Sequence, residues 1–201
     1  MREFYQSIFA LTNEKLLDDL CNKSEMRHLK KGEMIVSAGE MQEKLFFLNR
    51  GILRGYYFDE DGKEITDCFG IRRGTPVMPS DSLQDTLIAK INIVALTEAE
   101  LIGLPVAVIM ELLQQYPEVL KLYNKLLIMQ TEEHWGAKQA ICRYKAADLI
   151  QWFKKTYPGM IDVIPHTYIA SFLGISPVHF SRERNRRQPD EKGDCAEDHK
   201  D

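Results

Sequence analysis

The stretch from Ile164 to Arg187, IPHTYIASFLGISPVHFSRERNRR, most constrains what this chain can fold into. Ala170 is small enough to lie where two helices cross closely, and Gly174 suits a tight turn that needs a positive φ. Ser176 and Pro177 then fit the N-cap and the first position of a second helix. Together these features predict a helix-turn-helix of the kind that binds DNA.

Apolar side chains occupy the positions that hold two such helices together: Ile169, Leu173, Ile175 and Phe180. An ordinary αα-hairpin packed in a core has the same apolar pattern, but it predicts no run of cations after the turn. Four arginines follow the turn here: Arg182, Arg184, Arg186 and Arg187. Residues 177–188 therefore carry a net charge of +3, which favours contact with phosphates.

Charge is distributed unevenly along the 201 residues, whose formal net charge is −4. Residues 189–201 alone carry six acidic residues and two lysines, with few large apolar groups. We predict that they form a disordered acidic tail. A local basic segment still attracts phosphate in such a chain, because binding depends on the local field and not on the overall charge.

The four cysteines, Cys21, Cys68, Cys142 and Cys195, follow no zinc or iron–sulfur spacing. We interpret them as free thiols in a reducing cytosol. No apolar run approaches the roughly 18 residues of a membrane span. The sequence therefore predicts a cytoplasmic protein with no membrane partner, no metal site and no cofactor.

Short, β-rich runs broken by glycine extend from Glu25 to about Leu104. Asp61-Gly62 between two of these runs is a hairpin signal. Many short strands with frequent turn glycines predict a rolled antiparallel sheet. Residues 3–23 before it have the pattern of short amphipathic helices, with Thr12 or Asn13 as a cap.

Helical patterns replace the strands after Pro105, and Pro117 suits the first turn of a long helix. Apolar residues at spacings of three and four mark one face of this helix: Val119, Leu122, Tyr123, Leu126 and Met129. Leu120, Leu127 and Ile128 widen the apolar zone beyond this face. We expect the face to contact the same helix of a second copy; the alternative is a helix buried against the rolled sheet.

The predicted fold class is α+β, with an antiparallel, jelly-roll-like β-roll, a long dimerisation helix and a C-terminal helix-turn-helix. We place the β-roll sensor domain at 1–115, the dimerisation helix at 116–137, the DNA-binding domain at 138–188 and the tail at 189–201. A separate helix is expected over about 138–156.

The order of these parts resembles the Crp/Fnr family of bacterial transcription regulators. The similarity is carried by KKGEMIVSAGE, KLFFLNRGILRGYYFDEDGKE and INIVALTEAELIGLP in the β-roll, and by YIASFLGISPVHFSR in the helix-turn-helix. It covers about residues 10–188. The resemblance implies a homodimeric regulator that binds a palindromic operator in double-stranded DNA, with half-sites about one helical turn apart.

The resemblance also implies where an effector would bind. Cyclic-nucleotide binders of this family carry Gly-Glu at the start of a short helix, and an Arg-Ser some ten residues later whose Arg neutralises the cyclic phosphate. Here Pro79-Ser80 or Ser80-Asp81 takes the place of Gly-Glu, while Ala89 and Lys90 take the places of Arg and Ser. We predict that Lys90 faces away from Ala89. Control by cAMP or cGMP is therefore disfavoured, and any effector is another small molecule.

The second helix of the pair is expected to enter the major groove. Arg182 matches a base-contacting arginine of the family and suits a bidentate contact with guanine. Glu183 occupies a position that is usually apolar in the family, so we expect it to weaken the far half of the helix. The residues predicted to contact DNA are His166, Thr167, Ser176, Val178, His179, Arg182 and Arg186.

Two other classes of protein could share this predicted fold: a metal enzyme and a module that does not bind DNA. A cupin-like metal enzyme would need histidine ligands inside the roll, but residues 29–133 contain no histidine. Hydrolase and phosphate-binding motifs are also absent, so we predict a protein that is not an enzyme. The remaining alternative is a ligand-binding or scaffold module of the same fold that no longer binds DNA.

Overall fold

The computed structural model describes residues 1–77 and 87–186. The chain divides into two compact units, Met1–Cys142 and a second unit that begins at Arg143. The predicted residues Pro79, Ser80 and Asp81, Arg187 and the predicted acidic tail lie outside the described residues. Among the helices that are described, none combines the length and the apolar character needed to cross a membrane.

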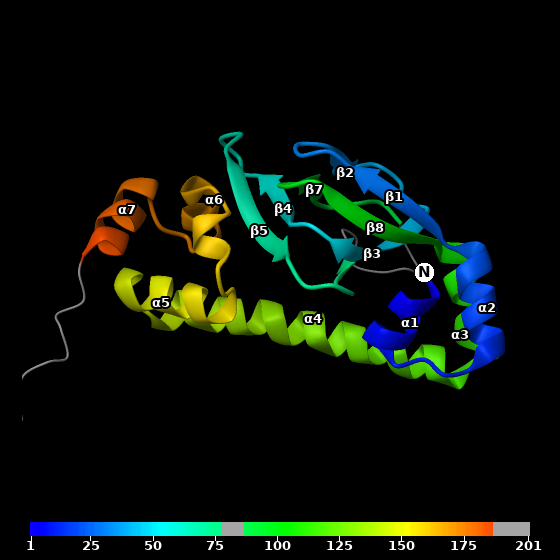
Figure 1. Ribbon diagram of the computed structural model, residues 1–201. Coiled ribbons are helices and arrows are strands. Elements are labelled where there is room, and N and C mark those ends of the chain that lie inside the picture. The colour runs from blue at the N-terminus through cyan, green and yellow to red at the C-terminus, as the bar shows by residue number, and fades with distance from the viewer. Residues whose placement is uncertain (78–86, 187–201) are drawn as a thin grey trace, which may run out of the picture. The chain divides into compact units, whose positions relative to one another are not determined.

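The first unit contains two four-stranded antiparallel sheets, with strand orders β1-β8-β3-β6 and β2-β7-β4-β5 (Figure 1). This agrees with the predicted antiparallel roll over residues 25–104. The strands are β1 (Glu25–Leu29), β2 (Met34–Val36), β3 (Lys44–Arg50), β4 (Leu53–Phe58), β5 (Glu64–Gly70), β6 (Pro76–Val77), β7 (Asn92–Ala95) and β8 (Ala99–Pro105).

The central strands β3 and β8 of the first sheet are buried on both faces, which explains their nearly continuous apolar sequence, whereas the edge strand β1 is mostly exposed. Side chains alternate along a strand. On β3, Phe46 and Leu48 join a core that also contains Leu53 and Ile93 of the other sheet. Phe47 faces the opposite way, into a second core formed with the helices of this unit. A strand with both faces buried has no polar alternation to reveal it.

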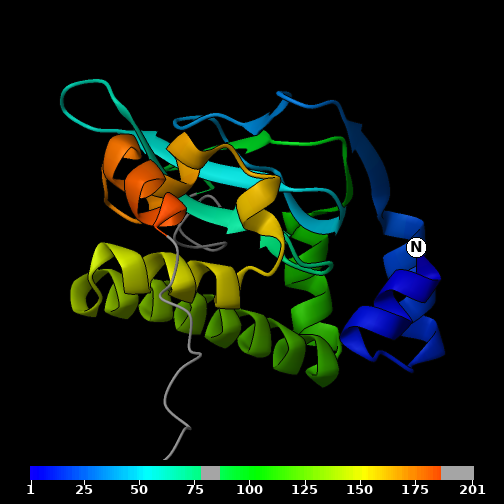
Figure 2. The same ribbon diagram turned by 60° about the vertical axis from the view of Figure 1, so that its left-hand side comes forward.

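The β4–β5 hairpin forms as Asp61-Gly62 predicted. The Asp59 carboxylate accepts hydrogen bonds from the backbone N–H groups of Asp61 (3.1 Å) and Lys63 (2.9 Å), and Gly62 has a φ of 76°. The tip of the hairpin extends beyond the sheet (Figure 2). Further along this pair of strands the register shifts by one residue at a β-bulge next to Gly55.

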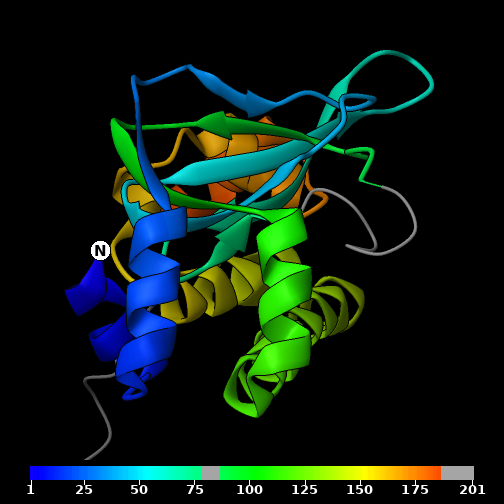
Figure 3. The same ribbon diagram turned by 90° about the vertical axis from the view of Figure 1, so that its right-hand side faces the viewer.

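Four helices complete the first unit: α1 (Arg2–Phe9), α2 (Glu14–Lys23), α3 (Val106–Gln115) and α4 (Pro117–Arg143). The Asn13 side chain caps α2 by accepting a hydrogen bond from the backbone N–H of Leu16, at 3.1 Å. Helices α2 and α3 lie side by side below the sheets (Figure 3). Both contact β8, so the helices close the outer face of the first sheet.

Helix α4 begins at Pro117, as predicted, but it is longer than expected. It continues without a break to Arg143, a length of 27 residues. The prediction that it ends at 137 and that a new helix starts at 138 is therefore wrong. The break falls at Tyr144-Lys145 instead, where Lys145 adopts an extended conformation before the next helix.

The second unit contains α5 (Ala146–Thr156), the short 3-10 helix η1 (Met160–Asp162), α6 (His166–Phe172) and α7 (Pro177–Asn185). Helix α7 contacts both α5 and α6. The buried apolar residues of this unit lie on these elements and in the turns between them, and they include Leu149, Ile150, Phe153, Ile164, Ile169, Ala170, Leu173 and Phe180.

Candidate nucleic-acid interface and effector pocket

The turn between α6 and α7 has the geometry that the sequence predicted. Gly174 lies in the left-handed region, with a φ of 67°. Its N–H donates to the carbonyl of Ser171 (3.1 Å), and the N–H of Ile175 donates to the carbonyl of Ala170 (3.0 Å). These two bonds form a Schellman motif, which satisfies carbonyls that the end of α6 would otherwise leave unpaired.

Helix α7 starts at the predicted cap. The Ser176 hydroxyl accepts a hydrogen bond from the N–H of His179 at 3.1 Å, and Pro177 occupies the first turn. Ala170, Ile169 and Phe180 are fully buried, as expected for residues that hold the two helices together. Sequence analysis therefore predicted the local structure of this pair correctly.

One face of α7 is open to solvent. Val178 is 79% exposed, and the side chains of Arg182 and Arg186 are 67% and 75% exposed. Three of the residues predicted to contact DNA therefore lie on an accessible surface. The His179 side chain is less accessible, at 41%.

Other predicted contact residues have roles within the unit. The His166 ring packs against Phe180, with 5.4 Å between ring centroids, and one ring nitrogen lies 3.2 Å from the carbonyl of Ile161. Arg184 also hydrogen-bonds this ring. The side chain of His166, a predicted phosphate contact, is therefore partly buried, whereas that of Thr167 beside it is exposed.

Glu183 turns inward, and its side chain is only 7% exposed. Arg186 Nη1 lies 3.2 Å from both carboxylate oxygens, and Arg182 Nε lies 3.6 Å from one of them. His179 Nε2 is 3.8 Å away. The charge that we expected to weaken the end of α7 is thus surrounded by cationic or potentially cationic groups, and the helix continues to Asn185.

A second candidate site is a pocket between the roll and α4. Strands β4, β5 and β7 line it together with one side of the helix. The lining residues are Leu53, Gly55, Asp67, Cys68, Phe69, Gly70, Thr75, Pro76, Val77, Ile91, Ile93, Gln130, Glu133 and His134. Among the described residues that line it there are two carboxylates, one histidine and no arginine or lysine, so the pocket lacks the arginine that would neutralise a cyclic phosphate.

Ala89 and Lys90, the two described residues of the predicted effector site, have different roles from a phosphate-binding pair. Ala89 is buried in the core between the two sheets, and its backbone bonds with Gly39 and Glu40. Lys90 is exposed. The two side chains therefore differ in direction as predicted, and neither lines the pocket.

Sequence analysis missed the polar side chains of this pocket. Asp67 Oδ2 lies 3.7 Å from His134 Nε2 on α4. The neighbouring Asp67 carboxylate is the main cause that raises the pKa of His134 to about 9. Burial raises the pKa of the neighbouring Cys68 thiol to about 12. Asp67 and His134 are 67 positions apart in sequence and form no recognisable motif, so only the folded chain brings them together.

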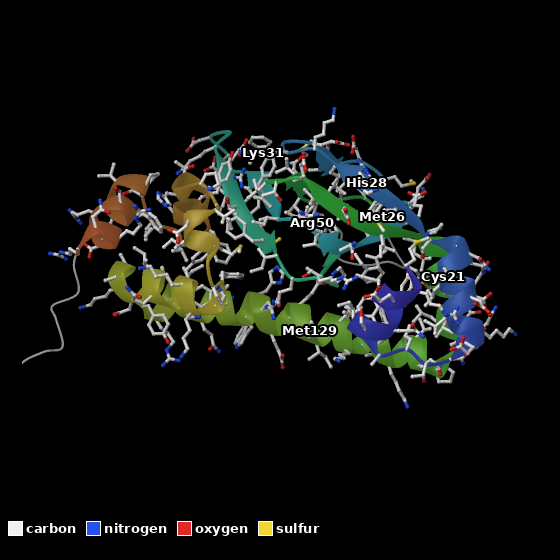
Figure 4. The ribbon with its side chains drawn as sticks, viewed as in Figure 1. Cys21, Met26, His28, Lys31, Arg50 and Met129 are labelled. Atoms are coloured by element: carbon white, nitrogen blue, oxygen red, sulfur yellow. The ribbon has the colours of Figure 1, made fainter. Side chains whose placement is uncertain are left out.

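The predicted dimer face of α4 needs correction. Leu126 is buried in the core of its own unit, and Val119, Leu122 and Tyr123 pack against that core. These four residues thus follow the alternative interpretation, a helix buried against the roll. Met129, the fifth predicted residue, is exposed on α4 (Figure 4).

A different part of α4 carries large exposed apolar side chains: Leu120 (47%), Ile128 (58%) and Trp135 (58%). Leu120 and Ile128 are two of the residues that widened the apolar pattern beyond the predicted face. Seven or eight residues separate the three, which places them near one side of a helix with 3.6 residues per turn. These three side chains form the exposed stripe of α4, and Met129 lies off it, about 100° around the helix from Ile128.

Residues 26–116 match the cyclic nucleotide-binding domain family. Among solved structures, the chain is similar to FixK2 from Bradyrhizobium japonicum, with 15% identity, a TM-score of 0.68, and coverage of 81% of this chain and 83% of that one. It is also similar to CLP, a c-di-GMP responsive global regulator from Xanthomonas campestris. The identity is 13%, the TM-score 0.69 and the coverage 85% and 89%.

A protein from Eubacterium rectale, described as a transcriptional regulator of the crp/fnr family, is 18% identical with a TM-score of 0.71. The match covers 90% of this chain and 85% of that one. No curated protein sequence matches the chain. At these identities the solved structures establish the fold alone: the chain shares the architecture of these three proteins, and its residues 26–116 match the cyclic nucleotide-binding domain model.

Proposed function

We propose that this protein is a dimeric, sequence-specific DNA-binding transcription regulator of the Crp/Fnr type. The observation that carries the proposal is the α6–α7 pair. Its turn, cap and buried contacts support a helix-turn-helix, and α7 exposes Val178 and Arg182 on one face. Arg182 lies one turn after Val178 on the same exposed face of α7, and an exposed arginine on a recognition helix suits a guanine edge in the major groove.

The proposed operator is a palindrome, because two copies related by a two-fold axis would present two α7 helices to one duplex. We propose the exposed stripe of α4 as the surface where the two copies meet. A helix that exposes tryptophan, isoleucine and leucine to solvent gains stability when a second apolar surface covers it. The fold of the structural neighbours supports the same regulatory role, and this role requires no catalytic activity.

The composition of the pocket between the roll and α4 favours an effector other than cAMP. Among its described lining residues, no arginine is present to pair bidentately with a cyclic phosphate, and Asp67 and Glu133 already have His134 and Arg72 as partners. Ala89, at the position that aligns with the phosphate-binding arginine, is part of the apolar core.

Selection from a randomised duplex-DNA pool at moderate salt, with and without cAMP, tests the proposal. We expect recovery of a palindrome in both conditions. The variant Arg182→Ala should lose discrimination at one base pair of each half-site, a change of roughly 1–3 kcal/mol. Arg184→Ala is the matched control, because that side chain contacts His166 instead of the open face of α7. A palindrome recovered only with cAMP would refute the proposed effector specificity.

The alternative function is a ligand-binding module whose helix-turn-helix no longer binds DNA. One observation favours it: Glu183 forms ion pairs with two arginines of α7, Arg182 and Arg186, which are then less available to DNA. This module would give no enriched sequence in the selection, and it would still bind its ligand in the β-roll.

A further inference from the structure

Asp67, Cys68 and His134 place a carboxylate, a thiol and an imidazole in the same pocket. One potential ligand atom from each residue lies within 4.8 Å of those from the other two. We propose that these three side chains form a binding site for a divalent transition-metal ion of the zinc class, which would join β5 to α4.

The β-bulge is the reason why two neighbouring residues can belong to one site. Consecutive side chains of a regular strand point to opposite faces. Here Cys68 pairs with Gly55 and Thr66 pairs with Tyr56, so Asp67 is an extra residue on β5. A bulge of this kind redirects a side chain. As a result, Asp67 and Cys68 both line the pocket beneath α4.

Gly55 makes room for the cysteine sulfur. A Cβ atom at this position would lie 2.6 Å from Cys68 Sγ, closer than such atoms approach. The absence of a side chain on β4 thus allows the sulfur to lie across the strand, next to the bulge. Any larger residue at position 55 would displace the thiol from Asp67 and His134.

The imidazole of His134 has the orientation of a metal ligand. Its Nδ1–H donates a hydrogen bond to the backbone carbonyl of Gln130, at 2.8 Å. Nε2 is therefore the nitrogen that faces Asp67, 3.7 Å away. Metal-binding histidines use such a bond on the second nitrogen to fix the ring and the tautomer.

The distances between the three groups require only a small adjustment. Zinc binds sulfur at about 2.3 Å and histidine nitrogen or carboxylate oxygen at about 2.0–2.2 Å, so tetrahedral ligands lie roughly 3.5 Å apart. Rotation of side chains at the open edge of the pocket would achieve this contraction, because His134 is half-exposed. A thiolate, an imidazole and a carboxylate together suit a borderline-soft ion such as Zn²⁺ or Co²⁺.

Three protein ligands leave a fourth position for water or for a group supplied from the pocket, as in zinc sites that bind exogenous ligands. Glu133 also lines the pocket, and it forms an ion pair with Arg72.

Titration of the full-length chain with Co²⁺ tests the site directly. The parent protein should carry Cys21→Ser, Cys142→Ser and Cys195→Ser, so that Cys68 is its single thiol. We expect one Co²⁺ per chain, a near-ultraviolet thiolate-to-cobalt charge-transfer band, and displacement of Co²⁺ by Zn²⁺. Cys68→Ser should abolish the band. His134→Gln and Asp67→Asn should each weaken binding by at least the roughly 10–100-fold that loss of an outer-shell partner costs.

His28→Gln is the matched control. His28 lies on β1, away from α4 (Figure 4), and its Nδ1 is 4.0 Å from a carboxylate oxygen of Glu100. This histidine–carboxylate pair lies outside the three-residue cluster, so the variant should bind Co²⁺ like the parent. Circular dichroism of each variant distinguishes loss of a ligand from loss of the fold. The proposal is overturned if the parent gives no charge-transfer band, or if folded His134→Gln binds with unchanged affinity.

Metal binding is independent of DNA binding and does not rest on the proposed function. The cobalt spectrum needs no DNA, so a silent DNA assay leaves its result intact. An absent cobalt band likewise leaves the operator selection intact.

Discussion

Replacing Glu183 by glutamine is expected to strengthen DNA binding. In the free protein the Glu183 carboxylate lies 3.2 Å from Arg186 and 3.6 Å from Arg182, the two cations best placed on the exposed face of α7. DNA phosphates or bases must compete with this carboxylate. The amide of glutamine keeps the shape of the side chain and removes the charge.

The two ion pairs set the size of the effect. Both guanidinium groups are mostly exposed, so each pair contributes no more than about 1 kcal/mol. Removing both ion pairs therefore changes the free energy of binding by at most about 2 kcal/mol, which corresponds to an increase in affinity of up to roughly 30-fold. Freeing about one cation for phosphate contact should also make the slope of log K against log salt more negative by about 0.9.

Fluorescence anisotropy with a selected operator duplex, repeated over a series of salt concentrations, measures both quantities. Asp162→Asn is the control, because it changes the net charge equally at an exposed position outside α7. The explanation fails if Glu183→Gln binds no more tightly than the wild type while remaining helical. It also fails if Asp162→Asn produces the same gain, since the effect would then come from overall charge.

Four further changes test other parts of the structure. Gly174→Ala should destabilise the second unit by about 1–2 kcal/mol in urea unfolding, because the φ of 67° is unfavourable for an L-residue; equal stability would contradict the turn. Trp135→Glu should convert the proposed dimer to monomer in analytical ultracentrifugation, and a persisting dimer would exclude the exposed stripe as the interface. The raised pKa of His134, about 9 beside Asp67 against 6.5 in an unfolded chain, gives stabilisation that is complete below pH 6.5 and lost as the pH rises through about 9. Since His134 is half-exposed, the stability advantage of the wild type over His134→Gln should fall by at most about 1 kcal/mol between unfolding at pH 6 and unfolding at pH 9. An advantage that is the same at both pH values would refute the pairing. Ala89→Arg should destabilise the β-roll by several kcal/mol in thermal unfolding, because it buries an unpaired cation, and a folded variant that gains affinity for cAMP would refute this placement.

Local chemistry explains which parts of the fold the sequence could predict. Asp61-Gly62, Asn13 and Gly174 each act within a few residues of themselves, through a turn, a cap or a left-handed backbone. Their structural effects are encoded in neighbouring positions. The hairpin, the start of α2 and the α6–α7 turn were therefore predictable from single residues.

The faces of α4 depend on distant parts of the chain. The spacing of Leu122 and Leu126 indicates an apolar helix face, but it does not say whether that face meets α1 and α2 or a second copy. The helix also passes position 138 without interruption, because nothing at that point breaks it, and Gly136 alone does not end a helix that has apolar residues on both sides. Tertiary packing therefore determines which surface the apolar face of α4 contacts, and the spacing of apolar residues does not.

The Asp67–Cys68–His134 cluster shows a second limit of sequence analysis. In a regular strand, Asp67 and Cys68 would point in opposite directions, so their adjacency argues against a shared site. The bulge that reverses this expectation is a property of the pairing between β4 and β5. A Gly at position 55 is compatible with a bulge, but it is equally compatible with an ordinary strand interior.

The unbroken helix α4 would convert a small tilt at the pocket into a larger displacement at its C-terminal end. His134 lies nine residues before Arg143, where the first unit gives way to the second, and nine residues of helix span about 14 Å. A tilt of only about 5° about His134 would displace the end of this rigid rod by about 1 Å. Because the hydrogen-bonded helix has no hinge along this length, it acts as a lever arm that delivers the displacement to Arg143 with little loss through bending.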